Sequence, residues 1–167
     1  MQLKRSLVLF GVMIVCIASD QATKAIARSL LTQGEILSFL GDTLRLQLAY
    51  NTGAFLSLGA TMPEGLRSSL LSIGVACVLL GLLVYTLRAK NEPPAATFSL
   101  ALVLGGGTSN LIDRLLFDGH VTDFLNMGVG GLRTGIFNVA DMAISGGVIF
   151  LLWLGFRRPQ GAEKTKT

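Results

Sequence analysis

The chain has 167 residues, of which 51% are hydrophobic and 14% are charged, with a net charge of +4 at pH 7. Water-soluble domains carry about 25% charged residues, so this composition is typical of a single membrane domain and excludes intrinsic disorder. The basic residues form short clusters and aromatic residues are few, which argues against nucleic-acid binding. One His and two Cys without metal-ligand spacing argue against zinc hydrolases, iron–sulfur proteins and disulfide scaffolds.

Four segments are apolar enough to cross a bilayer as helices, which takes about 20 residues each. We expect these spans at about residues 6–23, 68–87, 93–112 and 134–156 of one integral membrane domain, residues 1–167. The first span begins after basic residues, as a cleavable signal peptide does. Its apolar run is longer than the hydrophobic region of a signal peptide, so we expect it to be retained.

Basic residues near the span ends predict the orientation. They stand at positions 4 and 5, 88 and 90, and 157 and 158, which four spans place on one side of the membrane. Lys and Arg are enriched on the cytoplasmic side, so both termini are predicted to be cytoplasmic. Two outer loops, at about 25–67 and 113–133, then face the opposite side.

Both outer loops carry signs of structure. Residues 43–50 alternate between apolar and mostly polar side chains, which predicts a half-buried strand in a small sheet on the outer membrane surface. Residues 121–125 predict a second, short strand. Glycines at 128, 130, 131 and 135 indicate tight turns in a flexible loop.

Polar side chains at membrane depth gather near the outer ends of the spans. They are Asp20, Asn110, Asp113, Arg114, Asn138 and Asp141, with Asp123 in the loop between the last two spans. A charge in hydrocarbon costs at least about 2.5 kcal/mol, so such residues usually mark a function or a paired structural site. We expect Asp141 about seven residues into its span, roughly 10 Å deep, with the glycine-rich loop folding Asp123 above it.

Two carboxylates held together there would share one proton, because repulsion and desolvation raise the pKa of one of them. Such a pair suits peptide hydrolysis. The ionised Asp takes a proton from the attacking water, while the protonated Asp polarises the scissile carbonyl. Asn110, Asn138 and Arg114 are candidates to hold the carboxylates or the substrate backbone.

Structural roles remain open for several of these residues. Asp141 could pair with Arg114 as a structural acid. Asp20 and Lys24 are four residues apart and favour an ion pair over catalysis. Asp113, next to Arg114, favours a role in orienting the helix end.

Three further alternatives use other chemistry. Ser109 with His120 could form a Ser/His pair, although no glycine follows the serine. Lys24 could be the base of a Ser–Lys scheme, but Asp20 beside it favours the charged form. A small transporter could use the same acids as a relay, which would favour acids near the midplane and repeat symmetry that the sequence lacks. A non-enzymatic acid cluster is the general alternative.

Five motifs together resemble the lipoprotein signal peptidases of bacteria, the signal peptidase II family. They are Asp-Gln-Ala-Thr-Lys at 20–24, Asn-Thr-Gly-Ala-Phe at 51–55, Asn-Leu-Ile-Asp-Arg at 110–114, Val-Thr-Asp-Phe at 121–124 and Phe-Asn-Val-Ala-Asp at 137–141. Each motif alone is weak. Five in this order, in a four-span chain of this length, are specific.

The resemblance implies an aspartic endopeptidase with Asp123 and Asp141 as its catalytic dyad, without metal or cofactor. The implied substrate is a prolipoprotein whose signal peptide is cut just before a diacylglyceryl-modified cysteine. The residues implied to bind substrate or shape the site are Asn51, Gly53, Asn110, Arg114 and Asn138, and those implied to support it are Asp20, Lys24 and Asp113.

The implied setting is the bacterial inner membrane, with the active site near the periplasmic face. The implied fold has four transmembrane helices, a small periplasmic β-sheet and a flexible glycine-rich loop over the site. Membrane lipids are the expected surroundings, and a monomer would suffice for the site.

One position departs from the family's pattern. The family usually has Gly-Gly-Ala-x-Gly-Asn where this chain has Gly-Gly-Gly-Thr-Ser-Asn at 105–110, so Ser109 replaces a glycine. A buried helical serine can donate to the carbonyl four residues earlier. A serine also adds little bulk on a helix, so we expect activity to survive.

Overall fold

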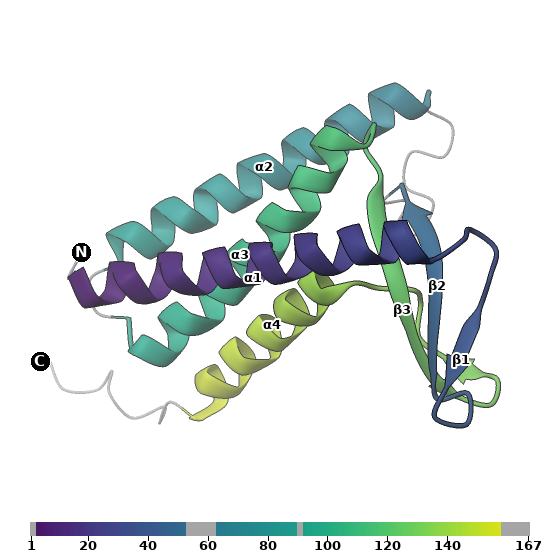
Figure 1. The fold of residues 1–167 in the computed structure, drawn as a ribbon. Coiled ribbons are helices and arrows are strands. Elements are labelled where there is room, and N and C mark those ends of the chain that lie inside the picture. Colours follow the sequence, from purple (N-terminus) through teal and green to yellow (C-terminus); the bar gives the residue numbers. More distant parts are fainter. Residues whose placement is uncertain (1–2, 53–62, 90–91, 158–167) are drawn as a thin grey trace, which may run out of the picture.

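The computed structural model describes residues 3–52, 63–89 and 92–157, which form four long helices and a small sheet (Figure 1). The helices are α1 (Leu3–Leu30), α2 (Glu64–Arg88), α3 (Pro94–Leu116) and α4 (Val139–Arg157). All four contain segments long and apolar enough to cross a membrane, which confirms the expected number of spans. α1 begins and α4 ends at the end of the bundle opposite the sheet.

Several helix ends differ from the expected spans, and α1 and α2 begin earlier, at Leu3 and Glu64 instead of residues 6 and 68. α1 continues to Leu30 instead of ending near residue 23, because the charges of Asp20 and Lys24 are paired inside the protein. α3 likewise continues to Leu116 instead of residue 112. α4 begins at Val139 instead of residue 134, because the preceding residues are extended and the backbone of Phe137 bonds to that of Leu125 in the sheet. The outer loops are correspondingly shorter.

Three consecutive glycines let α3 pack closely against the other three helices. A Cβ added at positions 105–107 in turn would lie 2.8 Å from Cβ of Cys16 on α1, 2.5 Å from the carbonyl oxygen of Ala140 on α4 and 2.5 Å from Leu79 on α2. Successive helical residues point about 100° apart, so each glycine faces a different neighbour. This close approach brings the polar outer end of α3 against α1 and α4.

The sheet is antiparallel with the order β1-β2-β3-β4. Its strands are β1 (Leu37–Phe39), β2 (Leu44–Asn51), β3 (Val121–Val129) and β4 (Leu132–Arg133). Both expected strands are therefore confirmed, and the second is longer than expected. The sheet stands across the end of the bundle where α1 and α3 end and α4 begins (Figure 1).

The glycine-rich stretch forms the tight turn between β3 and β4, where Gly130 has a φ of 55°. Asp123 lies on β3 instead, opposite Ala49 of β2. The strand pairing therefore positions Asp123, which lies in the predicted strand of the second outer loop.

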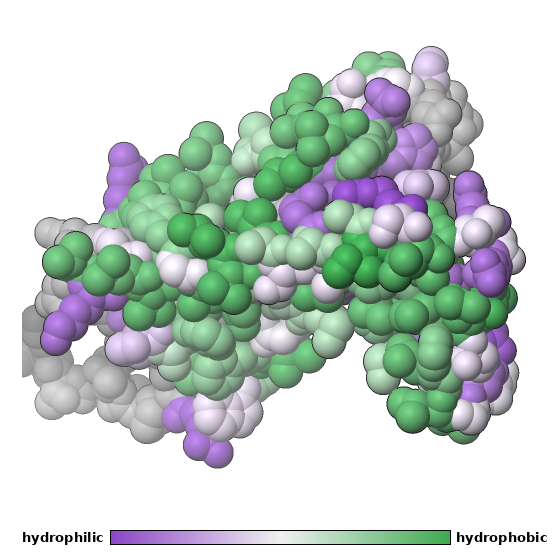
Figure 2. All heavy atoms as spheres, viewed as in Figure 1, coloured by the Kyte–Doolittle hydropathy of each residue, from purple (hydrophilic) through white to green (hydrophobic). Residues whose placement is uncertain are grey.

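The outer surface of the helices is apolar. In the most apolar 18-residue windows of α1, α2 and α4, only 11%, 6% and 11% of residues are buried, against 61% in α3. Figure 2 shows green, hydrophobic atoms over most of the helical surface on this face. Such a surface is unfavourable in water and fits the hydrocarbon of a bilayer.

Candidate active site

A buried group of charges lies where α1 meets α3. Lys24 Nζ is 2.7 Å from Asp20 Oδ2 and 3.2 Å from Asp113 Oδ2, and all three side chains are completely buried. Buried charges are stable only when they are paired and hydrogen-bonded. The expected Asp20–Lys24 ion pair is confirmed, and Asp113 is a third member.

Lys24 connects this group to the candidate dyad through Asn110. Lys24 Nζ donates to Asn110 Oδ1 at 2.8 Å, and Asn110 Nδ2 donates to Asp141 Oδ1 at 2.8 Å. The ammonium group thus fixes which end of the amide faces Asp141. The described oxygen partners of Lys24 Nζ belong to Asp20, Asp113 and Asn110, and none is the serine hydroxyl that a Ser–Lys scheme would need.

Asp141 and Asn138 form a capping box at the start of α4. The backbone N–H of Asp141 donates to Asn138 Oδ1 at 2.9 Å, and the backbone N–H of Asn138 donates to Asp141 Oδ2 at 3.2 Å. Asp141 is the third residue of the helix, so its expected position seven residues into the span was wrong. The positive end of the helix dipole favours a carboxylate there.

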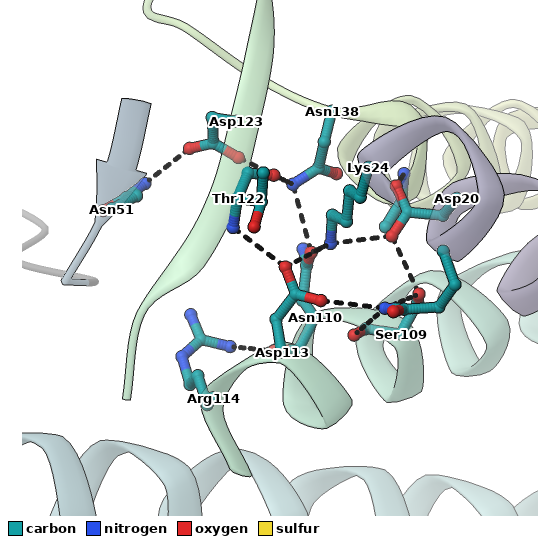
Figure 3. A network of polar contacts seen from close by, with 12 residues as sticks. Asp20, Lys24, Asn51, Ser109, Asn110, Asp113, Arg114, Thr122, Asp123 and Asn138 are labelled. Atoms are coloured by element: carbon teal, nitrogen blue, oxygen red, sulfur yellow. Dashed lines mark hydrogen bonds and ion pairs between the residues drawn. The ribbon is translucent and has the colours of Figure 1, made fainter. Parts of the chain in front are cut away.

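Asp123 is 2% exposed and receives two amide hydrogen bonds, from Asn138 Nδ2 at 2.7 Å and from Asn51 Nδ2 at 3.1 Å (Figure 3). Burial, and next the negative charge of Asp141, raise the pKa of Asp123 to about 6. The two amide donors act in the opposite direction.

Two asparagines therefore connect the two carboxylates. Asn110 donates to Asp141, and Asn138 donates to Asp123 while also donating to Asn110 Oδ1 at 3.1 Å. The structure thus brings together Asp123, Asp141, Asn51, Asn110 and Asn138 from β2, α3, β3 and the start of α4. Gly53 lies outside the described residues.

Arg114 lies at the outer end of α3, within electrostatic range of Asp141 and Asp123. Its Nη1 donates to the carbonyl oxygen of Asn110 at 3.5 Å, and its buried Nε has no hydrogen-bond partner among the described residues. The hydrogen bonds that hold Asp141 come from Asn110 and Asn138. A structural Arg114–Asp141 ion pair is not present in the described part of the chain.

Asp113 joins α3 to the sheet and to α1. Its Oδ2 accepts the backbone N–H of Thr122 at 2.8 Å, and its Oδ1 accepts Gln21 Nε2 at 2.9 Å. Gln21 and Thr122 were not among the expected site residues. Their positions, next to Asp20 and Asp123 in the motifs, were the available signal.

Ser109 joins α3 to α1 through its hydroxyl. Its hydroxyl donates to Asp20 Oδ2 at 2.8 Å instead of to the carbonyl four residues earlier. A hydroxyl directed at a carboxylate in the buried charge group does not fit the Ser/His scheme. His120 lies in the turn after α3, with Nδ1 3.1 Å from the carbonyl oxygen of Phe117.

A pocket of about 360 Å³ opens beside Asp141. The residues that line it are Thr134, Gly135, Ile136, Phe137, Asp141, Met142 and Ser145. They come from the extended segment before α4 and the first turns of that helix. The carboxylate of Asp141 in a mainly apolar pocket suits an amphiphilic ligand.

Among the described residues, no group of three or more His, Cys, Asp and Glu side chains is arranged to hold a metal ion. The chemistry that the described side chains offer is that of a partly buried carboxylate pair oriented by amides. Acid–base catalysis on a water molecule is the reaction type that this pair can support.

Comparisons with known proteins agree on one family. Residues 12–157 match the family described as Signal peptidase (SPase) II. A lipoprotein signal peptidase of Burkholderia mallei (strain SAVP1) is 35% identical over 153 residues, covering 92% of this chain and 90% of that protein. One from Burkholderia vietnamiensis (strain G4 / LMG 22486) is 36% identical over 156 residues, with the same coverage.

Two solved structures of a bacterial membrane enzyme share the fold. One has a TM-score of 0.76 at 23% identity, covering 90% of this chain and 93% of that chain. The other has a TM-score of 0.79 at 21% identity, covering 95% and 93%. The chain belongs to the signal peptidase II family, the lipoprotein signal peptidases, which remove signal peptides from prolipoproteins.

Proposed function

We propose that Asp123 and Asp141 are the catalytic dyad of this protease. The observation that carries the proposal is the shared amide network, in which Asn138 and Asn110 orient both carboxylates. The pKa of Asp123 is raised first by burial and next by the charge of Asp141. An acid and a base in one site need such a difference in proton affinity between the two carboxyl groups.

The dyad acts on a water molecule held between the carboxylates. Asp141 takes a proton from this water, and the resulting nucleophile attacks the scissile carbonyl carbon. Asp123, protonated, donates a hydrogen bond to the carbonyl oxygen as negative charge develops there. Collapse of the tetrahedral intermediate breaks the C–N bond, and the leaving amine receives a proton from the pair.

The remaining residues of the expected site bind or shape it. Asn110 and Asn138 orient the two carboxylates, while Asn51 holds the outer oxygen of Asp123. Arg114, whose Nε has no partner among the described residues, is proposed to donate to a carbonyl oxygen of the substrate. Gly53 is proposed to shape the substrate path, as the motif at 51–55 implies.

The substrate is a prolipoprotein whose cysteine carries a diacylglyceryl group, and cleavage occurs just before that cysteine. The mainly apolar pocket beside Asp141 is the proposed place for the modified residue. The chemistry requires no cofactor or metal, and one copy of the chain contains every proposed site residue.

The enzyme lies in the bacterial inner membrane among its lipids, with both termini cytoplasmic and the site near the periplasmic face. Arg5, Arg88 and Arg157 all lie at the helix ends opposite the sheet, as the enrichment of basic residues on the cytoplasmic side requires. The sheet and the dyad then lie at the outer membrane surface.

The test is a gel-shift cleavage assay in detergent on a diacylglyceryl-modified prolipoprotein. Asp123→Asn and Asp141→Asn keep the side-chain size but cannot share a proton, and each is expected to abolish cleavage. Asp118→Asn is the matched control, because Asp118 is an exposed turn residue with a φ of 50°, which Asn tolerates. Full cleavage by either dyad variant would refute the mechanism.

A precursor that lacks the diacylglyceryl group tests the substrate assignment in the same assay. We expect no cleavage of this unmodified precursor. Equal cleavage of both precursors would show that the pocket does not select the lipid. If the wild type cleaved neither precursor, this result would favour a transport or structural role for the acid cluster.

A further inference from the structure

Ser109 occupies a fully buried position on α3. Ser99, another fully buried serine on this helix, donates its hydroxyl to the carbonyl of Ala95 at 2.9 Å, as helical serines commonly do. Ser109 instead reaches a different helix and donates to Asp20 Oδ2 at 2.8 Å. The hydroxyl of Ser99 therefore bonds within α3, whereas that of Ser109 connects α3 to α1.

A second contact fixes the direction of the Ser109 hydroxyl. Gln21 Nε2 donates to Ser109 Oγ at 3.0 Å and to Asp113 Oδ1 at 2.9 Å. Because Oγ accepts from Gln21, its own proton is directed to Asp20. Figure 3 marks this contact between Ser109 and Asp20. The serine thus adds a donor to a group that holds two buried carboxylates and one ammonium.

Asp20 in turn holds the start of α4. Its Oδ1 accepts the backbone N–H of Ala140 at 2.8 Å, and Ala140 immediately precedes Asp141. The first N–H groups of a helix have no partner within the helix, and a carboxylate there is favourable. Asp20 therefore connects α1 to the residue beside the proposed catalytic carboxylate.

We propose that Ser109 is a positioning residue for Asp141, which acts by fixing the carboxylate of Asp20 that holds the start of α4. The inference rests on the proposed function, because it gives Ser109 a part in the reaction only through Asp141. A second route leads to the same side chain, since Asp20 also fixes Lys24, and Lys24 orients Asn110.

Alanine at position 109 separates positioning from packing. Ser109→Ala keeps the helix propensity and almost the whole side-chain volume, but it removes the hydrogen bond to Asp20. A misplacement of 1 Å at a reacting group can cost about 100-fold in rate. For a smaller shift transmitted through Asp20, we expect kcat to fall about threefold to tenfold, with KM within about twofold of the wild type.

The pH dependence of kcat/KM supplies a readout that packing alone does not move. The charged groups that face Asp123 are Asp141 from α4, Lys24 from α1 and Arg114 from α3. Ser109→Ala removes none of them. If Asp141 moves away, its charge raises the pKa of Asp123 less, and the limb at which activity falls with rising pH moves to lower pH.

The experiment compares wild type, Ser109→Ala, Ser109→Gly, Ser99→Ala and Asp141→Asn on a diacylglyceryl-modified prolipoprotein, at a temperature where thermal unfolding shows each variant folded. Ser99→Ala is expected to match the wild type in kcat and pH profile. Ser109→Gly is expected to repeat the kinetic change of Ser109→Ala with a lower unfolding temperature, since glycine disfavours helix.

Two results would overturn the inference. In one, Ser109→Ala has the kcat and the pH limb of Ser99→Ala; in the other, it loses thermal stability alone. Retained cleavage by Asp141→Asn would be different, because it would refute the proposed function and the inference with it, whatever Ser109→Ala shows.

Discussion

Asn138 and Asp141 hold each other through two reciprocal hydrogen bonds at the start of α4, at 2.9 and 3.2 Å. The same asparagine donates its side-chain amide to Asp123 at 2.7 Å. One side chain therefore caps the helix and joins the two proposed catalytic carboxylates. Because these roles use different atoms of Asn138, Oδ1 and Nδ2, mutations can separate them.

Asn138→Ala is expected to lose both roles. Removing a helix cap costs about 0.5–2 kcal/mol of stability, and Asp123 loses its shorter hydrogen bond. Asn138→Ser retains a cap acceptor but is too short to reach Asp123. We expect the Asn138→Ser variant to unfold at a higher temperature in detergent than the Asn138→Ala variant. Both variants should lose at least about 100-fold in kcat/KM, as for a misplaced reacting group. Near-normal cleavage by the serine variant would show that the bridge to Asp123 is dispensable.

The raised pKa of Asp123 predicts the pH dependence of cleavage. In the proposed mechanism Asp123 is the protonated partner, and a pKa raised to about 6 means that it holds its proton below that pH and loses it above. In the free enzyme, kcat/KM is therefore expected to fall as pH rises through about 6. A profile without a limb in this region would contradict the assignment of the proton to Asp123.

Asn51→Ala is expected to move that limb to higher pH. Asn51 donates to the carboxylate of Asp123 at 3.1 Å, which favours the ionised form and lowers the pKa of Asp123. Removing the donor leaves burial and the charge of Asp141 to raise this pKa further. Gln47→Ala, which removes another amide from β2, is the control and should leave the limb in place. A shift of this limb to lower pH in the Asn51 variant would contradict the expectation that the Asn51 amide lowers the pKa of Asp123.

Much of the fold was predictable because hydrophobicity is read over whole segments. Four apolar stretches predict the four membrane-spanning helices, and the alternation at residues 43–50 predicts β2. The start of α4 was not predictable, because residues 134–138 are apolar enough to continue a span. Backbone pairing of Phe137 with Leu125 keeps them extended, and this contact is set by the tertiary fold.

The candidate site was predictable in its residues but not in its connections. Helical spacing placed Asn138 near Asp141, but their relationship is a capping box that depends on where the helix begins. Ser109 shows the same limit. A helical serine can donate to the carbonyl four residues earlier, but the hydroxyl of Ser109 donates to Asp20 on α1. The hydrogen-bond partners of a buried polar group depend on the neighbouring helices, which no local pattern encodes.

Lys24→Met is expected to destabilise the protein strongly. It leaves Asp20 and Asp113 buried without their cation, and removing one partner of a buried ion pair costs about 3–5 kcal/mol. Asp42 and Arg45, which are partly exposed to water, form the comparison pair, at 2.6 Å. Arg45→Met should lower the thermal unfolding temperature in detergent much less than Lys24→Met, since the charges of this pair remain accessible to water. Equal effects of the two variants would show that the buried group does not depend on Lys24.

Gly106→Ala is expected to disturb the site through helix packing. A Cβ at position 106 would lie 2.5 Å from the carbonyl oxygen of Ala140, beside Asp141, so α3 and α4 must move apart. We expect a lower unfolding temperature and at least about 10-fold slower cleavage, because the reacting carboxylate moves with α4. Gly146→Ala is the matched control on α4, where the added Cβ meets nothing within 4 Å. It should leave cleavage unchanged and stabilise the helix by about 0.5–1 kcal/mol. A Gly106→Ala variant as active and stable as Gly146→Ala would show that the close contact between α3 and α4 does not position Asp141.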